Sequence, residues 1–253
     1  MSHVPSRSKT LISLLALSLI GMSAVATATP TNSRWMSLSV GMSSLVTPAA
    51  VDVNWDIQTI KPLNYAPQSS GNAATALLGY GYQYHMDSAF LPAVRIGGQY
   101  QYLAAASVKG KSTNSTLPDY TYQDNVSSNV LWLDAQFDLV NLNRFTPYVE
   151  VGAGAAYNSF SKYSETYGTG DAPVGGNGLN FGSKSSLHVA YKAGVGVNYG
   201  VPIKAGSILQ VGVFYNYVDF GGVSSAVSSL SGNPQLTQNM QGNEYGLAIR
   251  YAL

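Results

Sequence analysis

The 253-residue chain contains no cysteine and few charged residues. Without cysteine, the chain has no disulfide framework, no thiolate nucleophile and no site for lipoprotein processing. Charged residues make up 10% of the chain, against about 25% in an average globular protein. A water-soluble β-barrel of this size needs more charge on its outer surface, so the composition argues against one.

The N-terminal residues have the layout of a secretory signal peptide. Arg7 and Lys9 precede an apolar run from Leu11 to Ile20. Ala26-Thr27-Ala28 then forms a small-x-small cleavage site. An uncleaved inner-membrane anchor is the alternative, but serine and glycine interrupt a run already shorter than the roughly 20 residues that span a bilayer. We predict a cleaved signal peptide over residues 1–28.

Residues 29–253 contain no interdomain linker and no long apolar run, so we predict one domain without a transmembrane helix. Of the 13 basic residues, two belong to the signal, which leaves 11 against 12 acidic ones. A nearly neutral chain lacks the positive surface by which proteins hold nucleic acid. We therefore expect no nucleic-acid partner.

Eight segments alternate large apolar residues with glycine, alanine, serine, glutamine or a charged residue. An alternation that repeats every two residues predicts β-strands. A bulky apolar face opposite a small or charged face is typical of strands in a transmembrane barrel. The segments are Arg34–Val46, Ala73–His85, Ala93–Leu103, Asn129–Leu139, Tyr148–Asn158, Leu187–Tyr199, Ser207–Val218 and Glu244–Leu253.

The gaps between these segments alternate strictly between short and long. Three gaps are short: Met86–Pro92, Val140–Pro147 and Gly200–Gly206. Four are long and rich in serine, asparagine, glycine and threonine: Thr47–Asn72, Ala104–Ser128, Ser161–Ser186 and Phe220–Asn243. Barrels of bacterial outer membranes have short periplasmic turns and longer extracellular loops. The gaps therefore predict four extracellular loops on an all-β, eight-stranded antiparallel barrel.

The last strand carries a recognisable pattern: polar, any, Gly, any, any, hydrophobic, any, aromatic. Glu244, Gly246, Ile249 and Tyr251 fill it and resemble the C-terminal signal read by the barrel assembly machinery of bacterial outer membranes. The chain departs from that signal by continuing to Leu253 instead of stopping at a terminal phenylalanine. An edge strand of a soluble sheet that happens to end the protein is the alternative.

Residues 29–253 as a whole resemble the small eight-stranded outer-membrane barrels, namely the transmembrane domain of outer membrane protein A and the opacity-type surface proteins. The resemblance implies a location in the bacterial outer membrane and contact with its lipids. Full-length outer membrane protein A also has a periplasmic peptidoglycan-binding domain, for which this chain has no room. Direct tethering to the cell wall is therefore not implied.

Eight ionisable residues fall on the inferred inward face. An eight-stranded barrel has an interior that side chains fill, and buried charges there need partners. A salt-bridged plug is one interpretation, and a gated, narrow, ion-conducting lumen is the other. The eight residues are Arg95, Asp134, Asp138, Glu150, His188, Lys192, Glu244 and Arg250.

Aromatic residues occupy both strands and loops. Trp35, Trp132 and the strand tyrosines fit interfacial aromatic belts, although Trp132 shares the inward parity of Asp134. Loop aromatics either form a contact surface for another cell or matrix or pack the loops together, and the sequence leaves both readings open. They are Trp55, Tyr65, Tyr120, Tyr122, Tyr163 and Tyr167.

Catalysis has little support in the sequence. A lipid A-modifying hydrolase needs Ser, His and an acid together at the lipid-facing wall, whereas His85 and His188 both have inward parity. No His, Cys or carboxylate cluster has the spacing of a metal site. We expect no catalytic residues, no metal and no cofactor.

Three functions remain in order of preference. The first is a structural or surface-interaction role, in which extracellular loops contact host or matrix molecules in an adhesin-like manner. The second is a narrow passive channel or a carrier for small solutes. The third is a lipid A-modifying enzyme.

Overall fold

A computed structural model describes residues 32–53, 63–113, 119–167, 181–204, 207–226 and 235–252. All ten regular elements in these ranges are β-strands. No helix among the described residues is long and apolar enough to span a membrane. The predicted signal peptide, residues 1–28, and Trp55 lie outside the described ranges, so both predictions about them stay predictions.

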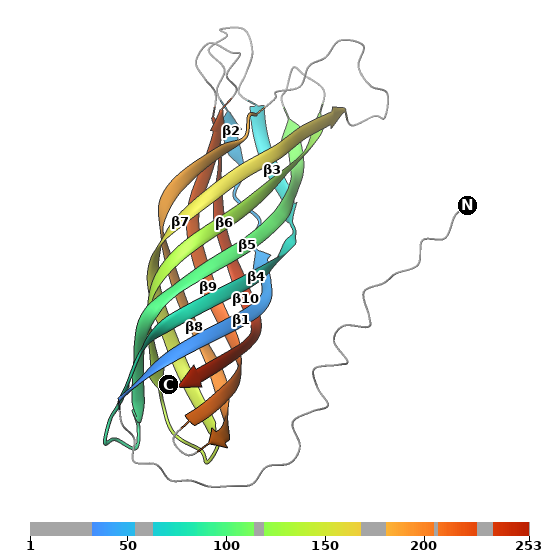
Figure 1. The fold of residues 1–253 in the computed structure, drawn as a ribbon. Coiled ribbons are helices and arrows are strands. Elements are labelled where there is room, and N and C mark those ends of the chain that lie inside the picture. Colours follow the sequence, from blue (N-terminus) through green and yellow to red (C-terminus); the bar gives the residue numbers. More distant parts are fainter. Residues whose placement is uncertain are drawn as a thin grey trace, which may run out of the picture.

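The strands form a single closed, antiparallel sheet (Figure 1). Around the ring, β5 pairs with β4, then follow β1, β10, β9, β8, β7 and β6, and β6 pairs again with β5. The predicted eight-stranded antiparallel barrel is confirmed. The strands are β1 Ser33–Leu45, β2 Val51–Val53, β3 Leu63–Ser70, β4 Asn72–His85, β5 Ala93–Thr113, β6 Tyr120–Asp138, β7 Phe145–Tyr167, β8 Lys184–Lys204, β9 Ser207–Ala226 and β10 Gln235–Ala252.

The outer wall carries a broad apolar belt. Leu131 and Leu133 of β6, for example, are 65% and 66% exposed. So many exposed apolar side chains on a monomer mark contact with an apolar phase, and around a closed barrel that phase is the acyl region of the outer membrane. The belt includes Met36, Leu38, Val40, Leu78, Tyr80, Tyr82, Ile96, Tyr100, Leu131, Leu133, Val151, Val189, Tyr191, Val195, Val213, Tyr215, Leu247 and Ile249.

Short turns join β4 to β5, β6 to β7 and β8 to β9 at one end of the barrel, near the C-terminus (Figure 1). The alternation of short and long connections therefore holds, and the end with the short turns is the periplasmic one. The other end is extracellular. There the strands continue well past the belt, which the sequence did not predict.

Most of the predicted loop Ala104–Ser128 is strand. β5 continues to Thr113 and β6 begins at Tyr120, with Ser112 paired to Tyr120. A register shift between Leu103 and Ala106 reverses which residues of β5 face inward. Above it the apolar residues point in and the polar ones point out, the opposite of the pattern expected for a strand in lipid.

The predicted loop Thr47–Asn72 also contains strands. β2 pairs with β3, and β3 pairs with the upper part of β5. Gly71 separates β3 from β4, and its amide donates to Ser107 O at 2.7 Å. β3 and β4 therefore occupy one strand position of the barrel wall, with an interruption at Gly71.

The predicted loops 161–186 and 220–243 also consist partly of strand, because β7, β8, β9 and β10 all continue into them. We call the part of the barrel above the apolar belt the extension. It comprises β2, β3 and residues 104–113, 120–128, 159–167, 184–186, 219–226 and 235–241. Its polar outer surface and apolar interior are those of a water-soluble β-barrel.

Candidate functional site

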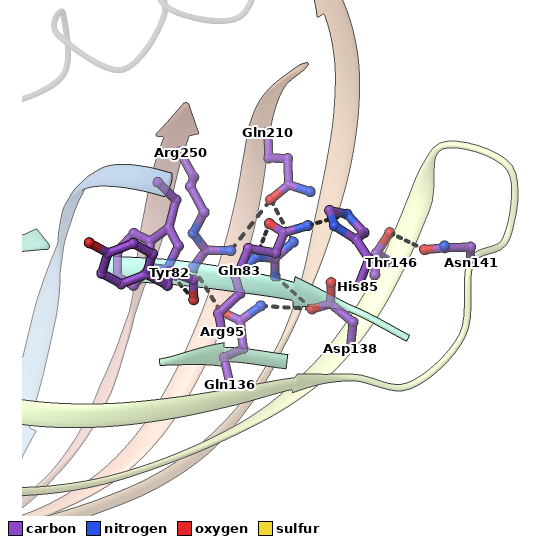
Figure 2. A network of polar contacts seen from close by, with 11 residues as sticks. Tyr82, Gln83, His85, Arg95, Gln136, Asp138, Asn141, Thr146, Gln210 and Arg250 are labelled. Atoms are coloured by element: carbon purple, nitrogen blue, oxygen red, sulfur yellow. Dashed lines mark hydrogen bonds and ion pairs between the residues drawn. The ribbon is translucent and has the colours of Figure 1, made fainter. Parts of the chain in front are cut away.

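The lumen is the first candidate, because the structure brings seven of the eight predicted inward charges into it as buried side chains. Arg95 lies near the periplasmic end and is 2% exposed. Its Nη1 contacts Asp138 Oδ1 at 2.6 Å, and its Nε donates to Gln83 Oε1 at 2.8 Å. Its Nη2 donates to Gln210 Oε1 at 3.1 Å. Gln83, Asp138 and Gln210 belong to β4, β6 and β9, and Figure 2 shows their side chains around the Arg95 guanidinium.

Arg250, on β10, reaches the same cluster without forming a salt bridge to any carboxylate that the structure describes. Its Nη2 donates to Gln136 Oε1 at 2.7 Å, and its guanidinium carbon lies 5.4 Å from the centroid of the Trp35 ring. Gln136 in turn donates to Asp138 Oδ1 at 2.9 Å (Figure 2). The second guanidinium is thus connected to the first through amides.

Trp35 is 2% exposed and lies inside the barrel, so its assignment to an interfacial belt was wrong. A Cβ added to Gly97 would lie 2.6 Å from the Trp35 ring, and one added to Gly81 would lie 2.9 Å from it. The indole therefore rests on backbone where neighbouring strands carry no side chain. Its Nε1 donates to Tyr82 O at 3.3 Å.

A second layer of charge lies around Lys192 of β8. Its Nζ is 2.9 Å from Asp134 Oδ1, 2.6 Å from Glu150 Oε1 and 3.2 Å from Gln99 Oε1. It also lies 5.2 Å from the centroid of the Trp132 ring. Trp132 is therefore a lumen residue, as its parity with Asp134 indicated, and not part of a belt.

Above this layer, Gln101 connects three strands. Trp132 Nε1 donates to Gln101 Oε1 at 2.7 Å, and Gln101 Nε2 donates to Thr75 Oγ1 at 2.9 Å and to Glu244 Oε1 at 2.5 Å. Glu244 is fully buried and forms no ion pair among the described residues. Arg95, Arg250 and Lys192 thus share the lumen with four carboxylates.

His188 is the predicted lumen charge that does not join the network. It is only partly buried, and its Nε2 lies 3.0 Å from Ser186 Oγ on the same strand. The glutamines, conversely, were not singled out from the sequence. The side-chain oxygens of Gln83, Gln99, Gln136 and Gln210 accept hydrogen bonds from the lumen cations, and Gln101 accepts one from Trp132. The inward parity of these glutamines was the signal available in the sequence.

The upper lumen is filled by an apolar core that reaches into the extension. Its largest members are fully buried, among them Phe160, Phe220, Leu236 and Met240. Among the described residues, the lumen thus holds paired charges in its lower part and packed apolar side chains in its upper part.

An aromatic cluster forms the top of this core. Tyr65 lies 5.5 Å from Tyr122 and 5.6 Å from Phe181, measured between ring centroids, and Tyr163 lies 4.9 Å from Phe181. Tyr65 donates its hydroxyl to Glu165 Oε1 at 3.0 Å, and Tyr163 donates to the same atom. Burial raises the pKa of the Tyr65, Tyr122 and Tyr163 hydroxyls well above the ordinary tyrosine value.

For three of the loop aromatics, this arrangement supports packing, the second of the two interpretations that the sequence left open. Tyr65 and Tyr122 lie in strands and are fully buried, and Tyr163 is half-buried against them, so these three pack the extension together. Tyr120 lies in β6 and is half-buried. Trp55 and the side chain of Tyr167 lie outside the described part of the chain.

One carboxylate is buried inside the extension. Asp124 is 0% exposed, and Gln238 Nε2 donates to its Oδ2 at 2.7 Å. Burial raises the pKa of Asp124 to about 7, and the hydrogen bond from Gln238 opposes that shift. The residue therefore titrates near neutral pH.

The predicted assembly signal occupies both faces of β10. Glu244 points into the lumen and Ile249 lies in the belt. A Cβ added to Gly246 would lie 2.2 Å from Val40 O, so only glycine fits there. Recognition of these residues by the assembly machinery stays a prediction. In the ranges that the structure describes, no group of three or more histidine or acidic residues could hold a metal ion.

No protein-family model and no curated protein matches this sequence. Solved structures similar to it include the outer membrane protein OprG from Pseudomonas aeruginosa, with 13% identity, TM-score 0.46, and coverage of 87% of this chain and 96% of that one. Neisserial surface protein A has 10% identity, TM-score 0.38, and coverage of 87% and 98%. The attachment invasion locus protein Ail of Yersinia pestis has 14% identity, TM-score 0.34, and coverage of 87% and 99%.

Proposed function

We propose that this outer-membrane barrel is a surface-contact protein whose extension presents its extracellular connections to molecules on another cell or matrix. The observation that carries the proposal is the extension itself. Eleven residue steps separate Tyr102, the last belt residue of β5, from Thr113, the end of that strand. With about 3.3 Å per residue and a tilt of about 40°, that distance corresponds to roughly 28 Å above the belt.

The core of the extension supports a rigid platform. Tyr65, Phe160 and Phe220 are each 0 to 1% exposed, and buried side chains of this size stabilise a fold by about 1.5–3 kcal/mol each. The ladder between β5 and β6 is paired up to Ser112 and Tyr120. A rigid support reduces the conformational entropy lost when the connections bind a partner.

The proposal is tested with cells that display the full-length protein. In one variant, residues 114–118, 168–180 and 227–234 are replaced by short glycine-containing turns, and the strands are kept. We expect attachment to host cells and to immobilised matrix proteins to fall to the level of cells without the protein. Heat-dependent gel mobility confirms that the variant barrel is folded, and unchanged attachment by a folded variant would refute the proposal.

A carrier for small apolar solutes is the second candidate, and the apolar upper lumen favours it. Leu103, Val130 and Val218 line this region as 0% exposed side chains. A carrier would have to move these side chains apart each time a solute molecule crosses the lumen. Uptake of a fluorescent apolar dye by vesicles that contain the protein, at a rate above that of empty vesicles, would support this function over the first.

A further inference from the structure

Four lysines lie on the outer face of the extension, on one side of the barrel. Lys109 and Lys111 belong to β5, Lys162 to β7 and Lys184 to β8, and all four are exposed. None of them forms a salt bridge with a residue that the structure describes. We call this set the lysine face.

The strand register places the four lysines near one another. Lys109 and Lys111 are two residues apart on one strand, about 7 Å. Lys109 pairs with Gln123 of β6, and Gln123 pairs with Ser164 of β7. Lys162 is two residues before Ser164 on β7. It therefore lies about 10 Å from Lys109, a distance of about two strand spacings. Lys184 pairs with Phe160 on the next strand.

A backbone irregularity exposes Lys162. Its φ of 54° lies in the left-handed region, which is uncommon for a residue with a side chain. The register shift that contains it turns Tyr163 and Glu165 into the core and leaves Lys162 exposed. The same irregularity thus completes the aromatic cluster inside and adds a cation outside.

The surroundings of the lysine face suit a sugar with negative charge. Hydroxyl and amide side chains lie between the lysines and supply hydrogen-bond donors and acceptors: Thr121, Gln123, Ser159, Ser164, Thr166 and Ser185. In the part of the chain that the structure describes, Asp52 and Asp119 are the exposed carboxylates near its upper edge, and Asn64 donates to Asp52 at 2.8 Å. Glu165 points inward to Tyr65 and Tyr163. The face is therefore positive on balance.

The positions of the lysines along their strands give the height of the lysine face above the apolar belt. Lys184 is three residues above Leu187, Lys162 five above Tyr157, and Lys109 seven above Tyr102. At about 3.3 Å per residue and a tilt of about 40°, these steps correspond to roughly 8, 13 and 18 Å above the belt.

Side chains on a barrel wall point sideways, along the membrane plane. At this height the neighbouring layer holds the phosphorylated sugars of lipopolysaccharide, the glycolipid of the outer leaflet. A soluble polymer from another cell would instead meet the connections at the end of the barrel.

We propose that the lysine face binds the phosphorylated inner saccharides of lipopolysaccharide. The lysine ammonium groups contact phosphate and carboxylate groups of the glycolipid, and the intervening hydroxyl and amide groups hydrogen-bond its sugars. This site differs from the connections in the proposed function and does not depend on them. It orients the barrel in the leaflet and orders the lipid on one side of it.

The test uses the full-length protein in detergent, titrated with fluorescent lipopolysaccharide that carries lipid A and the phosphorylated inner core. A lysine near an anionic membrane surface contributes about fivefold to binding. We expect K109Q/K111Q to weaken binding about 25-fold, and addition of K184Q to weaken it about 100-fold. Replacing the same three lysines by arginine keeps the charge and should preserve the affinity.

The matched control removes two cations from the other end of the barrel. Arg34 and Arg144 lie near the periplasmic end, beside Tyr82 and Tyr199, and R34Q/R144Q should bind as the wild type does. Unchanged binding by the lysine variant, an equal loss in the control, or equal affinity for dephosphorylated glycolipid would each overturn the proposal. Lysine-dependent binding of a soluble sulfated polysaccharide, with glycolipid binding unaffected, would also overturn it.

Discussion

Lys192 is the cation that balances two carboxylates inside the lumen, so its replacement by methionine tests how the charge network is held together. Methionine keeps much of the volume of the side chain and removes its charge. Asp134 and Glu150 then remain 4% and 7% exposed, without the ammonium group that lies 2.9 and 2.6 Å from them. A buried charge that loses its partner destabilises a protein by about 3–5 kcal/mol.

A loss of about 4 kcal/mol lowers the folding equilibrium constant roughly a thousandfold. The change is measurable by denaturant unfolding of the barrel in lipid vesicles, followed by tryptophan fluorescence. Trp35 and Trp132 are both 2% exposed in the lumen, so their emission reports on the folded interior. We expect the unfolding midpoint of K192M to move to a much lower denaturant concentration.

The triple variant K192M/D134L/E150M separates the loss of a partner from the loss of the residue. Apolar groups of similar volume replace the whole set, and such replacement is often close to neutral. We expect its stability to lie within about 1 kcal/mol of the wild type. A single variant as stable as the wild type, or a triple variant as unstable as the single one, would refute the reasoning.

Three further predictions concern the extension and the wall. Burial raises the pKa of Asp124 from 3.8 to about 7, so the folded state keeps a proton that the unfolded chain releases. The contribution of Asp124 to stability should therefore fall by up to about 4 kcal/mol as pH rises from about 4 to about 7, and D124N should remove this contribution from the pH dependence measured in unfolding titrations. G81A would place a Cβ 2.2 Å from a backbone oxygen of β5 and should lower the unfolding free energy by about 1–3 kcal/mol. Its control, G98A, has its nearest such contact at 3.7 Å and should change the unfolding free energy by less than about 0.5 kcal/mol. Y65F removes one hydrogen bond to Glu165 and should lower the stability of the extension by about 1 kcal/mol. Limited proteolysis should then cleave the extension faster in the variant than in the wild type.

Each of these predictions has an outcome that contradicts it. A flat stability profile from pH 4 to pH 8 would mean that Asp124 is solvated. Equal effects of the two alanine substitutions would mean that close backbone contact does not require Gly81. Faster cleavage of Y65F within the membrane-spanning strands, with the extension unaffected, would mean that Tyr65 does not hold the extension together.

The sequence alone determined the number of membrane strands, their antiparallel order and seven of the eight charges predicted for the lumen. Period-two alternation is a local property, and a chain in lipid must satisfy every backbone hydrogen bond within a closed sheet. Segments such as Leu131 to Phe137, with apolar residues at every second position, therefore indicate both a strand and its lipid-facing side. The parity of Arg95 and Lys192 then assigns them to the interior.

The tertiary structure decided how far the strands continue and which groups pair. Above the belt the solvent changes from lipid to water, so the alternation reverses, and the register shifts near Leu103 and Lys162 change which residues face inward. An alternation that places apolar residues on the outer face therefore does not indicate the strands above the belt. The pairing of Lys192 with Asp134 and Glu150 likewise depends on which strands are neighbours in the closed ring. Closure also buries Tyr65 against Phe181, because residues far apart in the chain meet only when the wall encloses a common core.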